Sequence, residues 1–110
     1  MIPLEGSASS LISERVNTML AMQVMSALSQ ATRFEVYTRL VEALPEGVAS
    51  GDLAASTNTA PSAMSAHLAI LSRAGLVVSR RIGKTVVYSA VTAPVADLSD
   101  LLLAKISRGD

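Results

Sequence analysis

The chain of 110 residues contains no cysteine and only one histidine, and both scarcities restrict its chemistry. Without cysteine it forms no disulfide, no thiolate metal site and no thiol redox switch. One histidine also excludes a cluster of histidine ligands within one chain. No glycine-rich phosphate loop or nucleophile-elbow pattern occurs. We therefore expect no enzymatic activity, no metal and no cofactor.

Long apolar runs are also missing, although half of the residues are hydrophobic. The longest runs are four residues, as in 101–104, whereas a membrane span needs roughly 20. The first five residues include an acid and no base, unlike the start of a secretory signal. The sequence predicts a soluble, cytoplasmic protein with one small core and no membrane partner.

Acidic residues are absent from the segment 53–96, although the chain as a whole has nine acids, nine bases and no net charge. The bases of this segment are Arg73, Arg80, Arg81 and Lys84. A local positive surface suits contact with phosphates, whatever the net charge of the chain. Chance clustering in a segment rich in Ala, Ser and Val is the alternative, and charge alone leaves both open.

Hydrophobic periodicity and turn residues predict one domain, residues 10–107, after a flexible tail, residues 1–9. The first helix begins at Ser9 or Ser10, and Thr32 with Glu35 forms the capping box of the second. The expected fold is mainly α with a small β-hairpin, a winged helix-turn-helix of order α-α-α-α-β-β-α. Its elements span 10–29, 32–44, 51–57, 61–73, 76–81, 85–91 and a last helix from Pro94.

The helix 61–73 has two contrasting faces. Met64, Leu68 and Leu71 share the side predicted to face the core. The opposite side carries Ser62, Ser65, Ala66, Ala69 and Arg73. Small side chains let a helix lie deep in a major groove, and serine hydroxyls bond phosphates or base edges. The plainer alternative is an ordinary surface helix of a protein with few charges.

His67 lies on the flank of this helix. We expect a partly buried, hydrogen-bonded histidine near the DNA surface rather than a metal ligand. The hairpin places Arg80, Arg81 and Lys84 around Gly83, where they would contact backbone phosphates or the neighbouring minor groove. Protection of an exposed sheet edge is a compatible alternative for the same cations.

The apolar side chains of the first helix cover more than one of its faces, which suggests a second packing partner such as another subunit. Its apolar side chains include Ile12, Val16, Met19, Leu20 and Val24, with Leu11, Met22 and Met25 widening the surface. A small hydrophobic effector enclosed by the first and last helices is an alternative that the sequence leaves open, beside ordinary core or interface packing.

Several motifs together resemble the ArsR-type winged-helix repressors, over about residues 10–107. The stretch 27–33 (ALSQATR) is similar to the opening of that family. The stretches 52–54, 65–71 and 74–77 are similar to its helix-turn-helix and exit. Residues 80–84 with Val87 and Tyr88 resemble its wing.

The resemblance implies a homodimer, formed by the first and last helices, that binds double-stranded DNA and represses a nearby promoter until an effector binds. The implied DNA-reading residues are Ser62, Ala63, Ser65, Ala66 and His67, with Arg73 on the same outer face and Arg80, Arg81 and Lys84 on the wing. The expected interface residues are Leu11, Ile12, Met19, Met22, Leu98, Leu101 and Leu102.

The chain also departs from the family pattern. The cysteines of metal-sensing members are missing from 52–56, and the last helix offers Asp97 and Asp100 without histidine, so we expect no transition-metal sensing. Ala66 replaces a common arginine, which weakens the expected DNA binding. Thr57 and Thr59 replace apolar residues, which predicts a looser turn. The alternative function is a winged-helix protein–protein interaction module with weak or no specific DNA binding.

Overall fold

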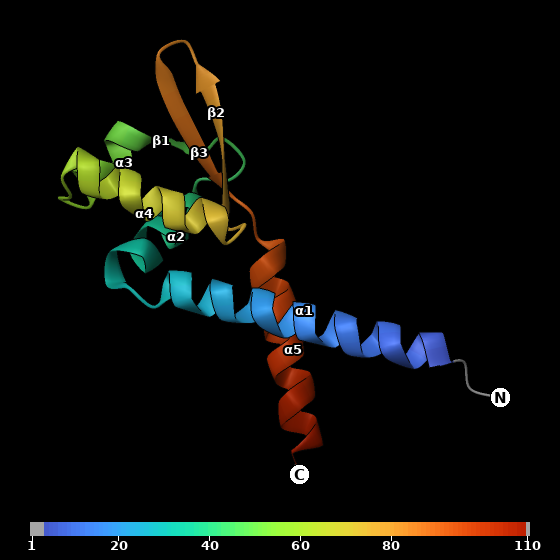
Figure 1. Cartoon of the computed structure of the whole chain (residues 1–110). Coiled ribbons are helices and arrows are strands. Elements are labelled where there is room, and N and C mark those ends of the chain that lie inside the picture. The colour runs from blue at the N-terminus through green and yellow to red at the C-terminus, as the bar shows by residue number, and fades with distance from the viewer. Residues whose placement is uncertain (1–3, 110) are drawn as a thin grey trace.

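The computed structural model describes residues 4–109, which form helices on one small antiparallel sheet (Figure 1). The observed order confirms the predicted fold class and adds one short strand, β1, before the third helix. The elements are α1 (Leu4–Leu28), α2 (Ala31–Glu42), β1 (Val48–Ala49), α3 (Ser50–Ser56), α4 (Pro61–Arg73), β2 (Val77–Ile82), β3 (Thr85–Ala90) and α5 (Ala93–Arg108).

The sheet has the strand order β1-β3-β2 with both pairings antiparallel. β1 pairs Val48 with Tyr88, and the hairpin pairs Arg80 with Val87. A two-residue turn closes the hairpin, and Gly83 adopts a φ of +62° there, which suits the tight turns that join twisted strands. β3 is therefore the central strand, and β2 lies at the edge.

The core lies where α2, α3 and α4 pack on the end of α1 and the base of the hairpin. Met64, Leu68 and Leu71 are at most 1% exposed, which confirms the predicted inner face of α4. Burial of each such side chain stabilises the fold by about 1.5–3 kcal/mol. The core comprises Val24, Ala27, Val36, Tyr37, Leu40, Leu53, Ala54, Met64, Leu68, Leu71, Leu76, Val77 and Ala90. This packing fixes which face of α4 is turned outward.

The capping box predicted at Thr32 is wrong. Gln30 is the N-cap of α2, and its side-chain oxygen accepts a hydrogen bond of 2.8 Å from the Arg33 amide. Thr32 lies inside the first turn, because the longer glutamine side chain supplies the acceptor that the helix start requires. The helix also ends at Glu42, before the predicted Leu44.

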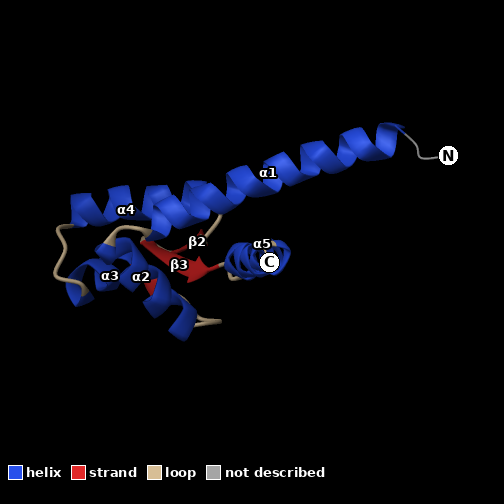
Figure 2. Ribbon diagram, turned by 90° about the horizontal axis from the view of Figure 1, so that it is seen from below, coloured by secondary structure: helices blue, strands red, loops and turns tan. Residues whose placement is uncertain are grey.

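α1 extends away from the rest of the domain (Figures 1 and 2). It begins at Leu4, so residues 4–9 of the expected tail are helical, and residues 1–3 lie outside the described residues. All side chains from 11 to 20 are exposed. The radius of gyration is 17.2 Å, compared with about 13 Å for a compact chain of this length. α1 is therefore packed against the domain only near its C-terminal end and where α5 crosses it.

Ion pairs join α1 to α5 at that crossing. Glu14 Oε1 lies 3.4 Å from Lys105 Nζ and 4.0 Å from Arg108 Nη1. All three side chains are about half exposed or more, so the pairs orient the helices more than they stabilise them. No helix among the described residues is long and apolar enough to cross a membrane.

Candidate nucleic-acid interface

A tight turn between α3 and α4 sets the direction of the second helix. The Thr57 hydroxyl donates to the carbonyl of Leu53 at 2.7 Å and lies 2.9 Å from Thr59 Oγ1. Asn58 takes a φ of +52°, a left-handed conformation that asparagine tolerates well. The two threonines therefore take part in hydrogen bonds within the turn, and the looser turn stays a prediction.

The outer face of α4 is exposed along its whole length. The exposed positions include every predicted DNA-reading residue except His67, namely Ser62, Ala63, Ser65, Ala66 and Arg73. Pro61 occupies the first turn, where its missing N–H leaves no carbonyl unsatisfied. Most of these side chains are short, and short side chains let a helix approach the floor of a DNA major groove closely.

His67 is half-buried at the edge of this face. Its Nδ1 atom lies 3.4 Å from Nη1 of Arg33, and Arg33 Nε donates to the carbonyl of Ala27 at 2.7 Å. The expectation of a partly buried, hydrogen-bonded histidine is confirmed. Sequence reasoning did not single out Arg33 as a functional residue, because the two side chains are 34 positions apart.

The hairpin separates the three predicted wing residues. Adjacent residues of a strand point to opposite faces, so Arg80, opposite Val87, and Arg81, opposite Val86, lie on different faces of the sheet. Arg80 donates to the main-chain oxygen of Glu46 at 2.6 Å and to Ser89 Oγ at 3.3 Å. Lys84 lies in the turn. Of the three wing cations, Arg81 and Lys84 are thus the exposed ones without a hydrogen-bond or ion-pair partner among residues 11–109.

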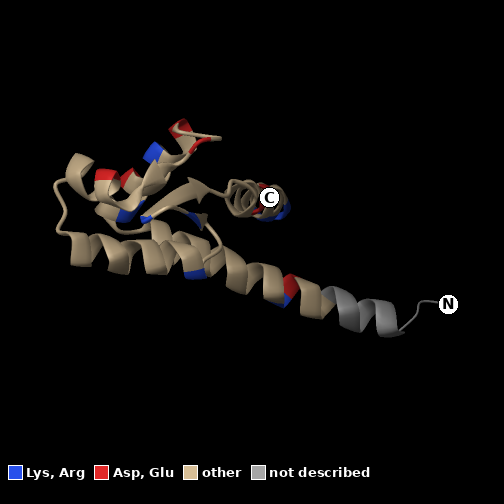
Figure 3. Cartoon of the chain, turned by 90° about the horizontal axis from the view of Figure 1, so that it is seen from above, with Lys and Arg blue, Asp and Glu red and all other residues tan. Residues whose placement is uncertain are grey.

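Acids are confined to part of the fold, whereas bases occur on most of its elements (Figure 3). The acids of residues 11–109 lie on α1, α2, α3 and α5 and on the loop before β1, whereas α4 and the hairpin carry only bases. Arg73 ends α4 beside the base of the hairpin. This distribution gives α4 and the hairpin a local positive potential, which suits a polyanion.

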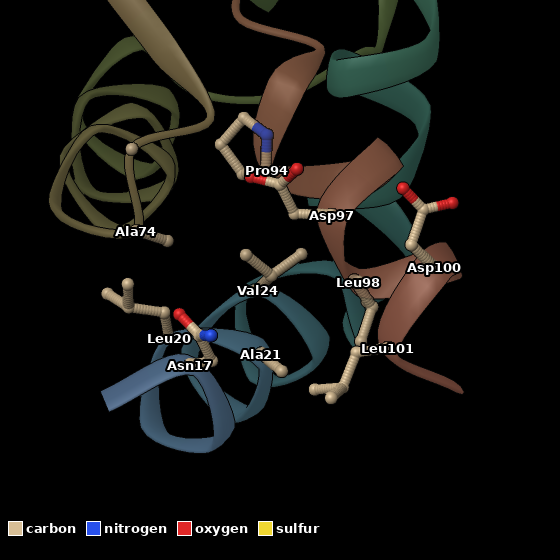
Figure 4. A pocket seen from close by; sticks show the side chains of 11 residues that line it. Asn17, Leu20, Ala21, Val24, Ala74, Pro94, Asp97, Leu98, Asp100 and Leu101 are labelled. Carbon is tan, nitrogen blue, oxygen red and sulfur yellow. The ribbon is translucent and has the colours of Figure 1, made fainter. Parts of the chain in front are cut away.

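A cavity of about 650 Å³ lies on another side of the domain, between α1, the turn after α4 and α5 (Figure 4). Its walls are mainly apolar, with Leu20, Val24, Leu98 and Leu101 among the lining side chains, and Asn17, Asp97 and Asp100 at its border. Two predicted interface residues, Leu98 and Leu101, are therefore half-buried around this cavity rather than fully exposed.

The other predicted interface residues form an exposed apolar surface on α1 and α5. Leu11, Ile12, Met19 and Met22 of α1 are 58–63% exposed, and Leu102 of α5 is 43% exposed. Val16, Leu103 and Ile106 are further exposed apolar side chains of the same two helices, at 47–68% exposure. Such a concentration of exposed aliphatic side chains is characteristic of an interaction surface rather than of a free monomer.

The geometry defines the class of the protein: a helix-turn-helix followed by a β-hairpin. Residues 28–80 match a family model described as a helix-turn-helix domain. The structure is similar to an ArsR-like transcriptional regulator from Rhodococcus sp. RHA1, with a TM-score of 0.76, 28% identity, and coverage of 84% of this chain and 85% of that chain. No curated protein matches the sequence.

Two further structures show the same likeness. HlyU from Vibrio cholerae is 30% identical over 78% of this chain and 90% of its own, with a TM-score of 0.66. A homodimeric winged helix-turn-helix DNA-binding domain from Mycobacterium bovis, a possible ArsR-family regulator, is 24% identical over 87% of this chain and 86% of its own, with a TM-score of 0.68. The chain belongs to the ArsR-type winged-helix family of transcriptional regulators.

Proposed function

We propose that this regulator is a homodimeric repressor that binds a specific double-stranded DNA site near a promoter. One observation carries the proposal: the exposed outer face of α4 has no acid, and it lies beside a hairpin whose Arg81 and Lys84 have no partner among the described residues. In the proposed complex α4 occupies a major groove, where Ser62 and Ser65 reach base edges or phosphates. Arg73, Arg81 and Lys84 contact phosphates on either side.

The dimer is proposed to form through α1 and α5. The exposed apolar side chains of α1 support it, as does the extension of this helix beyond the domain. A second subunit placed there would repeat α4 on the other side of a two-fold axis, as palindromic DNA sites require. The homodimeric Mycobacterium bovis domain has the same fold.

Fluorescence anisotropy tests this function. Purified protein is titrated into labelled DNA from upstream of its own gene and into a scrambled duplex, at several salt concentrations. Tight, salt-dependent binding with a preference for the upstream DNA supports a repressor. If the upstream DNA binds no better than the scrambled duplex, and selection from genomic fragments also yields no preferred sequence, the chain is instead a protein–protein interaction module.

A small apolar effector is a second proposal, and the cavity between α1 and α5 favours it. Its volume lies within the usual range of small-molecule sites, about 300–1,000 Å³. The neutral dye N-phenyl-1-naphthylamine serves as a probe, because it fluoresces in apolar surroundings. We expect Leu101→Phe, at the cavity wall, to reduce its fluorescence, and Leu103→Phe, an exposed site outside the lining residues, to leave it unchanged. Equal signals from both variants would place the dye elsewhere.

A further inference from the structure

Arg33 joins three helices through one guanidinium group. It lies in the first turn of α2, donates from Nε to the last turn of α1 at Ala27, and contacts His67 of α4 through Nη1. Both contacts are partly buried. Because Nε is already engaged and the group is planar, the position of Nη1 relative to the imidazole is fixed by the packing of α1 on α2.

The chemistry of this contact determines where the imidazole carries its proton. A guanidinium donates hydrogen bonds and accepts none, and it stays charged in proteins. The Nδ1 atom that faces it must therefore present its lone pair, which leaves the hydrogen on Nε2. The other tautomer, and the doubly protonated ring, would turn an N–H toward the guanidinium. No carboxylate lies within ion-pair distance of either side chain among residues 11–109.

We propose that Arg33 is a positioning residue that keeps His67 in the Nε2–H tautomer, so that His67 presents a hydrogen-bond donor to an acceptor on DNA. Nε2 has no hydrogen-bond partner among the described residues. His67 borders the outer face of α4, next to the exposed Ala66. The acceptor is a phosphate oxygen or a base-edge atom, both of which accept from neutral donors. The DNA contact rests on the proposed function, whereas the tautomer does not.

The single histidine makes the tautomer directly measurable. A long-range ¹H–¹⁵N correlation spectrum of the ¹⁵N-labelled protein without DNA, at a pH where the ring is neutral, distinguishes a protonated Nε2 from a protonated Nδ1. We expect Nε2–H to predominate in the wild type and the Nδ1–H fraction to rise in Arg33→Ala. Arg39→Ala, which removes an exposed arginine of the same helix paired with Glu35, is the control and keeps the wild-type spectrum.

A wild-type spectrum with Nδ1 protonated would overturn the proposal, and this result does not depend on whether any variant folds. An Arg33→Ala spectrum identical to the wild type, from a protein with wild-type circular dichroism, would overturn it too. Because these measurements contain no DNA, they stand even if the wild type binds no DNA. A wild-type protein that binds no DNA would refute only the proposed function and the contact of His67 with DNA.

DNA binding then tests the consequence. We expect Arg33→Ala and His67→Ala each to weaken binding about tenfold or less, as the loss of one hydrogen bond does. The double variant should bind like His67→Ala, and His67→Gln, whose amide offers a donor near the Nε2 position, should recover part of the affinity. An equal loss on specific and scrambled DNA indicates a phosphate acceptor, and a loss on specific DNA alone indicates a base edge. Fully additive losses would overturn the link between the two residues.

Discussion

Arg80 of β2 donates to the main-chain oxygen of Glu46 at 2.6 Å, across the face of the central strand β3. Its second nitrogen donates to Ser89 of β3 at 3.3 Å. The guanidinium therefore links the edge strand of the hairpin to the loop that precedes β1. The neighbouring Arg81 lies on the opposite face of β2. Two adjacent arginines thus have different surroundings, and mutations should separate their roles.

Arg81 and Lys84 should act as phosphate contacts. We expect the double change Arg81→Ala with Lys84→Ala to weaken binding to specific and scrambled DNA alike. Each lost phosphate contact should lower the slope of log affinity against log salt concentration by about 1. Anisotropy titrations across a salt series measure this slope. Arg39→Ala, an exposed cation of α2, is the matched control, and a slope no different from that control would contradict the assignment.

Arg80 should matter for the folded hairpin. Arg80→Ala removes two hydrogen bonds, and because the side chain is exposed we expect only about 0.5–1 kcal/mol of lost stability. Arg81→Ala, without such bonds, should change the free energy of unfolding by less than about 0.5 kcal/mol. Urea unfolding followed by circular dichroism compares the two. Equal stabilities would show that the Glu46 contact contributes nothing measurable.

Gly47 should tolerate no side chain. It adopts a φ of +85°, and a Cβ there would lie 2.5 Å from the carbonyl oxygen of Tyr88 and 2.6 Å from Ser89 Oγ. Both the left-handed backbone and the approach of β3 oppose substitution, so Gly47→Ala should cost about 2 kcal/mol or more. Gly51→Ala in α3 meets open space and should be stabilising by about 0.4–1 kcal/mol. Thermal unfolding of the two variants measures this difference in stability. Equal stabilities would show that the backbone at residue 47 shifts enough to accept the added methyl group.

Tyr37 should make stability fall at alkaline pH. Its hydroxyl donates to the carbonyl of Val91 at 3.0 Å, and burial raises its pKa above the ordinary 10.0. The unfolded chain then loses this proton first, so the stabilisation is complete below pH 10 and is lost as the pH rises above it. Tyr37→Phe should cost about 1 kcal/mol near pH 7, and the difference from the wild type should narrow toward pH 11. A constant difference, measured by urea unfolding, would refute this linkage.

The apolar surface of α1 should hold the dimer together. Ile12→Asp buries a charge in the proposed interface, so we expect a monomer at concentrations where the wild type is dimeric. Analytical ultracentrifugation measures the state of assembly. Phe34→Asp on α2 is the control, since Phe34 is 55% exposed and Ile12 is 63% exposed. A dimer that survives Ile12→Asp but dissociates with Phe34→Asp would place the interface on α2.

The sequence predicted those elements whose signals are local. The spacing of Met64, Leu68 and Leu71 defined the inner face of α4, because helical periodicity alone places them together. The hairpin followed from two β-rich segments around Gly83. The strand β1 was missed because two residues, Val48 and Ala49, carry no alternation, and β1 exists only through pairing with β3.

The errors at helix ends have a similar origin. Thr32 and Glu35 fit a capping box, but Gln30 supplies the acceptor instead, and local patterns do not rank such competing caps. In the candidate site, the contact between Arg33 and His67 depends on how α2 packs on α4, which no local pattern records. The residues predicted to bind DNA remain a prediction, although the structure places most of them on one exposed face.

The restriction of acids to elements other than α4 and the hairpin has a kinetic consequence. With a formal net charge of zero, the molecule is not drawn toward DNA as a whole. It behaves as a dipole, which the field of the duplex rotates once the positive end lies within about 8 Å, the screening length at physiological salt. Electrostatics should therefore govern orientation within short-lived encounters more than the frequency of encounters.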